Sequence, residues 1–380
     1  MKLRSQSMDL ALAWNRVAHS RRLQRGMGLI EALVGLAVGL VVALSVFQVY
    51  ATWDGRQRTS VAKAEGLSQG ALAAYLLERD LQQAGWGLSN VRAAANCPLQ
   101  GVDGFNAGGV VSPVLLPVQI RNLGNNNDDL VILYGNSALR TLHAGISSGG
   151  VQSNTMTLQQ GASGGFLVND RVLLHDGGSV CWLGGTITQV NNTLDQIVLD
   201  GLPPTNVDTL LNMGNAPSLN HWSVMAQTGN NVAGASALFQ LQRLQQLPGF
   251  LPGYAPPPQA AAMADGIVGL QAQYGVTDGT GGIIWQPRAQ TNVMNANASF
   301  NWTTVVAIRF GVLSRNEQFE APVNGVFVTP NQPVWSGGAF GVTDIQNLQG
   351  PTAVWNNYRY QVHEGVVALR NSTWGQRVPQ

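Results

Sequence analysis

The sequence predicts a mixed α+β protein in which one long N-terminal helix, residues 27–85, precedes a large strand-rich head, residues 86–380. Three observations predict this fold class. Apolar residues recur at helical spacing as far as residue 81, and no proline occurs before Pro98. Beyond residue 86, short apolar or alternating runs are separated by Gly, Asn, Asp and Pro, which is typical of strands and turns. The remaining length, about 300 residues, is enough to bury a core.

The helix begins in an apolar run, Leu29–Tyr50, whose only formal charge is Glu31. Roughly 20 apolar residues span a bilayer, so we predict a transmembrane part at about residues 28–50. Gly35 and Gly39 form a GxxxG pair in this run, a candidate contact between helices in lipid or a point of local helix softening. Basic residues ahead of the run place the N-terminus in the cytoplasm; they are Lys2, Arg4, Arg16, Arg21, Arg22 and Arg25.

Glu31 is the anomalous residue of this segment. Placing a carboxylate in the hydrocarbon of a bilayer is unfavourable by roughly 3 kcal/mol on insertion scales. A carboxylate in a membrane-spanning helix therefore usually has a functional role. A secretory signal peptide fits poorly, because its apolar segment is only about 7–15 residues long. A plain signal anchor fits the length and the basic flank but leaves Glu31 unexplained. Glu31 is therefore a candidate functional residue.

Past Tyr50 the helix is predicted to be amphipathic. Its apolar stripe consists of Val61, Leu67, Ala71, Leu72, Tyr75, Leu76 and Leu81. We expect this stripe to pack against the chain's own head, and we expect the helix to end near Ala84–Gly85, with Gly85 as its C-terminal cap. At 1.5 Å per residue the whole helix would be a rod of roughly 85 Å, far longer than a membrane is thick.

The head is predicted to consist mainly of strands. The segments with strand character are Leu130–Tyr134, Met156–Leu158, Arg171–His175, Val180–Leu183, Thr186–Val190, Ile197–Leu199, Trp222–Ala226, Ala237–Leu244, Thr303–Ser314 and Tyr358–Leu369. The proline-rich segment Leu247–Pro258 is interpreted as a loop that divides two groups of strands and thus two sub-lobes. We expect Ala260–Gln271 to form a short helix leading into a strand at Gln271–Tyr274.

Composition is typical of an exported surface and argues against a nucleic-acid partner. Charged residues make up 11% of the chain, against about a quarter in ordinary soluble domains, and glycine is abundant. The net charge is +1, and the basic residues that cluster do so in the leader, where they set topology.

The two cysteines, Cys97 and Cys181, fall on the side of the membrane that the positive-inside rule places outside the cytoplasm. That compartment is oxidising, so we predict one disulfide between them. Closing a loop of about 85 residues would stabilise the fold by roughly 4 kcal/mol on the chain-entropy model. Two free thiols remain the alternative, because sequence does not establish that the sulfurs approach each other.

Several motifs resemble one known superfamily. Arg25–Glu31, with its basic leader, Gly26 and a Glu five residues later, resembles the type III signal of type IV prepilins, which pseudopilins of type II secretion share. Four further blocks resemble the PilW family of minor pilins: Glu78–Trp86, Asp265–Val276, Val305–Arg315 and Val366–Asn371. Between Leu99 and Gln259 the likeness is small apart from Asp128–Tyr134.

The resemblance implies a pilin-like α+β fold, in which the amphipathic half of the helix packs on an antiparallel β-rich head. It implies that residues 1–26 are a leader removed by a prepilin peptidase, which cuts after Gly26 and methylates the new amine of Met27. Glu31 would pair with the N-terminal amine of a neighbouring subunit, which offsets the burial of both charges and fixes axial register.

The implied function is that of a minor pilin of a type IV pilus, which helps to initiate assembly and sits at or near the filament tip. Its expected partners are the prepilin peptidase, other minor pilins, the major pilin, the inner-membrane assembly platform and a large tip adhesin. The implied location is the inner membrane of a Gram-negative bacterium, with a periplasmic head, and then the pilus. A J-like pseudopilin of type II secretion and a membrane-anchored surface adhesin are the alternatives.

Enzyme and metal-site interpretations are weaker, and we expect no catalytic residue, cofactor or metal. Gly145–Gly149 matches the GxSxG pattern of hydrolases, but the loop-like segment that follows is not the helix that this motif requires. Asn125–Asp129 and Thr277–Gly281 offer oxygen ligands for calcium, yet turn chemistry explains them better. The five histidines form no HxxxH pair; they are His19, His143, His175, His221 and His363.

Overall fold

The computed structural model describes residues 28–88, 99–100, 115–122, 127–139, 143–175, 181–204, 206–226, 239–246, 260–296, 300–341 and 355–373. Its first element is α1, Leu29–Gln83, a helix of 55 residues. The chain divides into two compact units, Met1–Arg58 and Thr59–Gln380, with the boundary inside α1.

In the first unit, α1 is an apolar helix with exposed side chains, and it is long and apolar enough to cross a membrane. Two of its hydroxyl groups form hydrogen bonds within the helix. The Ser45 hydroxyl donates to the carbonyl of Val41 at 2.9 Å, and the Thr52 hydroxyl donates to the carbonyl of Gln48 at 2.8 Å. Such internal bonds are what a helix needs where water is absent.

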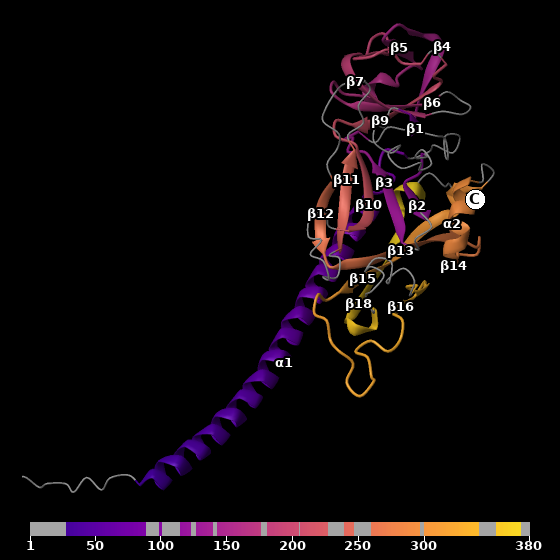
Figure 1. Cartoon of the computed structure of the whole chain (residues 1–380). Helices are drawn as coiled ribbons and strands as arrows, with labels where there is room; N and C mark the ends of the chain where they lie inside the picture. The colour runs from indigo at the N-terminus through magenta and orange to yellow at the C-terminus, as the bar shows by residue number, and fades with distance from the viewer. Residues whose placement is uncertain are drawn as a thin grey trace, which may run out of the picture. The chain divides into compact units, whose positions relative to one another are not determined.

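The second unit contains three larger sheets and the remainder of α1 (Figure 1). The four-stranded sheet has the order β14 (Ile283–Trp285), β13 (Ile267–Thr277), β15 (Val305–Arg315) and β18 (Tyr360–Ala368), and all its pairs are antiparallel. The five-stranded sheet has the order β12 (Ala260–Asp265), β11 (Phe239–Gln246), β10 (Ser218–Ala226), β3 (Asp128–Tyr134) and β2 (Val118–Asn122).

The seven-stranded sheet is built mostly from residues that lie between β3 and β10 in the sequence. Because β3 and β10 pair directly, from Ser218 opposite Tyr134 to Trp222 opposite Leu130, this lobe is an insertion into the five-stranded sheet. Its strands are β1 (Leu99–Gln100), β7 (Cys181–Asn191), β6 (Arg171–His175), β9 (Thr209–Gly214), β4 (Ala144–Gln152), β5 (Thr155–Leu158) and β8 (Gln196–Leu199).

Shorter elements complete the described residues. They are α2 (Arg288–Ala296), α4 (Arg370–Thr373), the hairpin β16 (Val334–Trp335) with β17 (Gly338–Ala339), and three 3-10 turns at Ser163–Gly165, Trp302–Thr304 and Trp355–Asn357.

The main core lies where α1 meets the four- and five-stranded sheets. From α1 it contains Ala73, Leu77 and Leu81, all fully buried. The facing side chains include Leu130, Ile132 and Trp222 from the five-stranded sheet, and Ile308 and Phe310 from the four-stranded sheet. Burying a Leu side chain contributes roughly 1.5–3 kcal/mol, so these contacts explain why the amphipathic half of α1 belongs to the second unit.

Most predicted strands are present, but two predictions about the head are wrong. Cys181–Leu183 and Thr186–Val190, which were predicted as separate strands, belong to one strand, β7, and Val180 lies outside the described residues. The expected helix at Ala260–Gln271 is instead β12, a left-handed Gly266 with φ of 68°, and the start of β13. Ala is a strong helix former, but pairing of β12 with β11 overrides that local preference. The sequence reasoning also missed β2, β4, β9, β14 and α2.

The end of α1 confirms one prediction and corrects another. The helix ends at Gln83, and Gly85 adopts a φ of 79°, as a C-terminal cap requires. The buried face, however, is Gly70, Ala73, Leu77, Asp80 and Leu81, whereas Val61, Leu67, Leu72 and Tyr75 are exposed. The apolar stripe was misplaced because the docked face includes a glycine and a carboxylate. The predicted dividing loop Leu247–Pro258 lies outside the described residues.

Candidate assembly site

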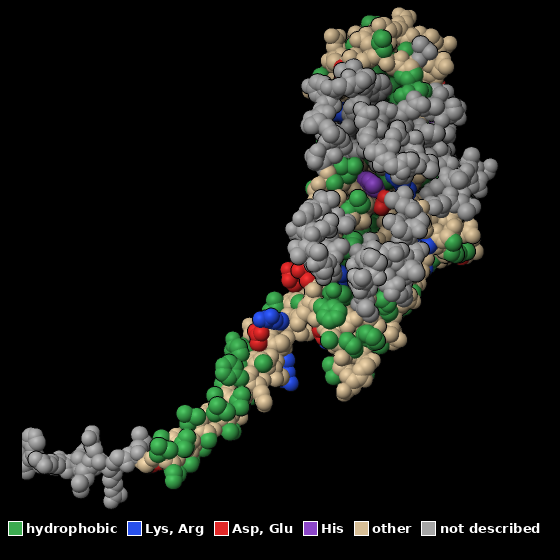
Figure 2. All heavy atoms as spheres, viewed as in Figure 1, with side chains coloured by type: hydrophobic (Ala, Val, Ile, Leu, Met, Phe, Trp, Pro, Cys, Tyr) green, Lys and Arg blue, Asp and Glu red, His purple; other side chains and the backbone are tan. Residues whose placement is uncertain are grey.

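The apolar half of α1 presents the predicted assembly residues. Glu31 lies in the first turn of the helix and is exposed, as are the apolar side chains that follow it (Figure 2). A methyl group added at Gly35 or Gly39 would meet nothing within 4 Å, so both glycines are open to a neighbouring helix. Gly26 and Met27 lie outside the described residues, and the cleavage site stays a prediction.

The other half of α1 is fastened to the head through Asp80, which is fully buried. Its Oδ2 accepts hydrogen bonds from Asn220 Nδ2 at 2.8 Å and from Trp222 Nε1 at 2.9 Å, both on β10. The Tyr134 hydroxyl donates to Oδ1 at 3.4 Å, and burial, reinforced by the Asp80 charge, raises the pKa of Tyr134. A buried carboxylate is tolerated only where hydrogen-bond donors surround it. Asp80 therefore fixes the rotation of α1 about its axis and its position along that axis relative to the sheet.

The last turn of α1 is held from two sides. The side-chain amide of Asn371 donates to the carbonyl oxygens of Gln83 and Ala84 at 3.3 and 3.2 Å, where a helix lacks partners of its own. On the other side, the Gly85 N–H donates to the Leu133 carbonyl at 2.9 Å, and the Gly135 N–H donates to the Trp86 carbonyl at 2.7 Å. The block Glu78–Trp86 therefore joins α1 to β3 and to the C-terminal segment.

Close approach of α1 to β18 depends on Gly70. A methyl group at this position would overlap the His363 ring and come within 3.0 Å of the Ser314 hydroxyl. His363 Nε2 is buried without a hydrogen-bond partner among the described residues, and burial lowers the pKa of His363. The neutral imidazole is thus the form that packs against α1.

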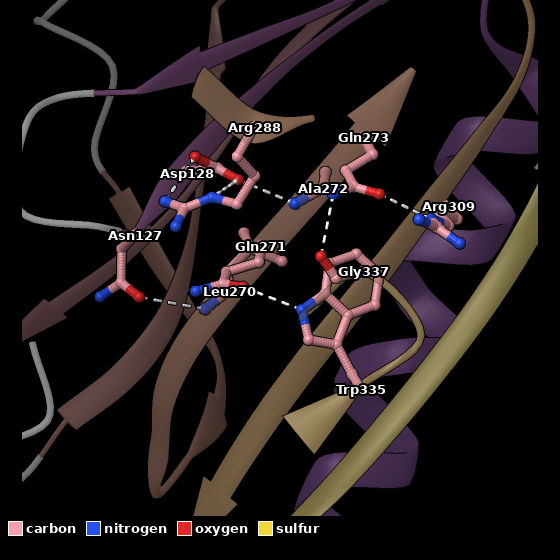
Figure 3. Close-up of polar contacts among 10 residues, drawn as sticks. All are labelled: Asn127, Asp128, Leu270, Gln271, Ala272, Gln273, Arg288, Arg309, Trp335 and Gly337. Carbon is pink, nitrogen blue, oxygen red and sulfur yellow. Dashed lines mark hydrogen bonds and ion pairs between the residues drawn. The ribbon is translucent and has the colours of Figure 1, made fainter. Parts of the chain in front are cut away.

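The middle block, which begins at Asp265, contributes β13, whose polar side chains connect separate parts of the head (Figure 3). Asp128 on β3 accepts from the Ala272 N–H at 2.8 Å and from Arg288 Nε and Nη2, each at 2.9 Å. Burial raises the pKa of Asp128, and the bond from Arg288 opposes that rise. The pair joins the five-stranded sheet to the four-stranded sheet and α2.

On the opposite face of β13, Gln271 and Gln273 hold the β16 region and β15. Trp335 Nε1 donates to Gln271 Oε1 at 2.8 Å, and Arg309 Nε donates to Gln273 Oε1 at 2.7 Å (Figure 3). The Arg309 guanidinium also lies over the Trp285 ring, 4.7 Å from its centroid. These contacts give structural roles to the two glutamines of the block at residues 265–276 and to Arg309 of the block at residues 305–315.

Only one cysteine of the predicted disulfide lies among the described residues. Cys181 is fully buried at the start of β7, whereas Cys97 lies outside the described residues. The parallel pairing of β1 with β7 sets Leu99 opposite Cys181, so the chain two positions beyond Cys97 runs beside Cys181. This proximity supports the predicted bond, which stays a prediction.

The motifs that weakly suggested an enzyme or a metal site have structural roles wherever they lie among the described residues. The GxSxG segment Gly145–Gly149 lies within β4, not at a turn from strand to helix. Asp278 Oδ1 accepts from the backbone N–H groups of Thr280 and Gly282 at 2.8 and 2.9 Å, which is turn chemistry. No cluster of three metal-ligating side chains occurs among the described residues.

Two of the remaining histidines lie close to aspartate side chains. His221 Nε2 lies 2.9 Å from Asp129 Oδ2, and His175 Nδ1 lies 3.4 Å from Asp208 Oδ1. The acidic pair that sequence offered as calcium ligands, Asp128 and Asp129, is therefore committed to Arg288 and His221.

Comparison with known proteins gives one match. Residues 228–371 match the family model described as type IV pilus-assembly protein W, PilW. Neither a curated protein nor a solved structure matches the chain. The matched region contains β11 to β18 and the start of α4, while Asp80 and Glu31 lie ahead of it. The C-terminal region of the chain is thus similar to the PilW type IV pilus-assembly proteins, over less than half of the chain's length.

Proposed function

We propose that this chain is a minor pilin that helps to initiate assembly of a type IV pilus and occupies a position at or near the filament tip. One observation carries the proposal: a single helix joins an exposed apolar segment with one carboxylate, Glu31, to a head whose C-terminal region is similar to the PilW family. The apolar half is free to contact other helices, while Asp80 and Asn371 fix the other half to the head.

The proposed role of Glu31 is electrostatic. After removal of residues 1–26, the methylated amine of Met27 carries a positive charge that a neighbouring subunit's Glu31 would neutralise. Two charges that enter an apolar environment together are far less unfavourable than either alone, so the pair selects one axial register between subunits. An acid in the first turn also favours the helix itself, by about 0.3–1 kcal/mol, so the test must separate assembly from folding.

A Glu31→Ala variant tests this role. We expect a normal amount of full-length chain in the membrane but a loss of about tenfold or more in sheared filaments, each measured by quantitative immunoblotting. The matched control is Glu65→Ala, which removes an exposed acid from the same helix outside the apolar run. Normal incorporation of the Glu31→Ala chain would sink the proposed pairing.

Processing and placement have their own tests. Mass spectrometry of the mature chain should find an N-methylated Met27 at its start; an intact leader would favour a plain membrane-anchored adhesin.

Cryo-electron microscopy of filaments should place the head at the tip, because a head of nearly 300 residues would crowd a uniform helical shaft. Regular occurrence along the shaft would overturn the tip assignment.

The nearest alternative is a J-like pseudopilin of type II secretion, which would share the cleavage site, the helix and Glu31. The match to the PilW family favours the pilus. Deletion of the gene separates the two roles: we expect loss of surface pili with normal protein secretion, whereas the reverse result would assign the chain to secretion.

A further inference from the structure

The last strand of the four-stranded sheet, β18, is an edge strand among the described residues. It pairs with β15 on one side, and no other described strand pairs with it. The Leu369 N–H donates to the Val306 carbonyl at 2.8 Å, and backbone groups alternate in direction along an antiparallel strand. The N–H and C=O groups of Val366 and Ala368 therefore point away from β15, toward the outer edge of the sheet.

This outer edge lacks the usual protection against a further strand. Natural edge strands are commonly protected by charged side chains, prolines or bulges. No charged residue or proline occurs from Gly365 to Leu369, and the register of β18 with β15 is regular. Val366 is 62% exposed. The backbone at this end of β18 is thus accessible for pairing.

The same end of β18 lines a groove of about 850 Å³. The other lining residues come from the last turns of α1 and from the segment that follows β3; they include Glu78, Gln82, Trp86 and Asn136. Their positions are held by hydrogen bonds within the head. Gln82 Nε2 donates to Glu78 Oε1 at 3.1 Å, and Trp86 Nε1 donates to the Ser137 carbonyl at 3.3 Å. A cleft of this size holds a compact ligand or a few residues of a peptide.

The two faces of β18 set the side-chain pattern that a strand in this groove would need. Val366 lies directly opposite Arg309 and so shares its face of the sheet, whereas Val367 belongs to the core that α1 covers. Side chains of an added strand would alternate in the same way. One set would lie beside the exposed Val366, and the other would face the polar side chains of Glu78 and Gln82.

We propose that this groove binds an extended segment of a partner protein, which adds to the outer edge of β18 as a further strand. A polypeptide is favoured over a small molecule because its backbone offers donors and acceptors at the repeat of the edge. The segment would alternate aliphatic residues, beside Val366, with polar residues, beside α1. Backbone pairing supplies the affinity and the alternating side chains supply the specificity. The inference goes beyond the pilus role and does not depend on it.

A peptide selection tests the proposal on the full-length chain in detergent micelles. The probe is a library of displayed random peptides of about ten residues. Val366→Pro is the test variant, since proline removes the outward N–H and is tolerated on an edge strand, while Val366→Thr is the matched control that keeps the N–H. We expect selected peptides to bind the wild type and Val366→Thr equally, and to bind Val366→Pro at least about tenfold more weakly. A selection that yields no such peptide would overturn the proposal.

A second measurement leaves the protein unchanged and so does not depend on the folding of Val366→Pro. A selected peptide is synthesised in two N-methylated forms, one methylated at odd-numbered residues and the other at even-numbered residues. Only one edge of an added strand faces β18, so one form should bind at least about tenfold more weakly than the other in fluorescence anisotropy. Equal affinities of the two forms would show that the peptide does not bind as a strand and would overturn the proposal.

Discussion

Asp80 of α1 accepts a hydrogen bond from the indole Nε1 of Trp222 on β10 at 2.9 Å, so a carboxylate of the helix lies inside the head. The adjacent Asn220 donates to the same oxygen at 2.8 Å. The helix is thus attached by a specific polar contact in addition to apolar packing. The contact joins residues 142 positions apart in sequence.

The first prediction concerns this contact. Asp80→Ala would leave the donors of Asn220 and Trp222 buried without their acceptor, and we expect it to lower the free energy of unfolding of the head by about 3 kcal/mol. Urea unfolding followed by tryptophan fluorescence measures the loss. Arg79→Ala is the control, because it alters an exposed neighbour in the same turn. A loss no larger than that of the control would contradict the anchoring role.

The role of Asp80 illustrates how far the sequence can be interpreted. The block Glu78–Trp86 was identifiable as the end of the helix, and Gly85 confirmed that boundary. When a helix is interpreted from the spacing of its apolar residues, however, a charged residue such as Asp80 is assigned to the exposed face. Only the fold reveals Asn220 and Trp222 as donors, because they lie on a strand far along the chain.

The second prediction concerns the buried ion pair of Asp128 with Arg288. Arg288→Ala would leave the Asp128 carboxylate buried without its cation, and we expect a loss of about 3–5 kcal/mol near neutral pH. Burial already raises the pKa of Asp128, and removal of Arg288 would raise it further. An acid whose pKa is higher in the folded state binds its proton more readily there, so the variant should regain stability as the pH falls.

The measurement is the unfolding free energy of the Arg288→Ala chain at about pH 7.5 and about pH 5. Arg359→Ala removes a comparable two-bond pair with Glu320, but Arg359 is 42% exposed. That control should lose no more than about 1 kcal/mol. A loss in Arg288→Ala that stays constant with pH would exclude the charge of Asp128 as its cause.

The head shows why composition alone gave the wrong element at Ala260–Gln271. The run of alanines at the start of this segment favours a helix. In the fold, residues 260–265 complete the edge of the five-stranded sheet, and Gly266 turns the chain into β13. Pairing with β11 decides the structure, and this pairing partner cannot be recognised from the residues of the run itself.

The third prediction concerns the close contact of Gly70 with β18. Gly70→Val places a branched side chain against the His363 ring and the Ser314 hydroxyl, and we expect destabilisation by about 1–3 kcal/mol from overpacking. Gly66→Ala is the control: the added methyl group lies 4.0 Å from the Asn316 nitrogen, in ordinary contact, and alanine favours the helix. Equal stability of the two variants would show that α1 does not need a glycine at position 70.

The fourth prediction is a pH dependence set by His363. Burial lowers the pKa of His363 from its usual 6.5, so the unfolded chain binds the proton more readily than the folded chain. The unfolding free energy is therefore not reduced by His363 at pH values above that usual pKa, and it declines as the pH falls below it. His363→Gln should reduce the decline between about pH 7.5 and about pH 5.5, whereas His143→Gln, at an exposed residue, should not. Identical pH profiles for the wild type and His363→Gln would refute the assignment.

The fifth prediction concerns Cys97 and Cys181. If they are bonded, peptide mapping without reductant should recover one linked pair of peptides that includes β7. Cys97→Ser and Cys181→Ser should each lower stability by up to roughly 4 kcal/mol, and the double variant should lose little more than either single one, because each single change already opens the loop. Two free thiols would behave differently. Cys181 is fully buried, so Cys181→Ser would still destabilise the lobe, but the effect of Cys97→Ser would then simply add to it.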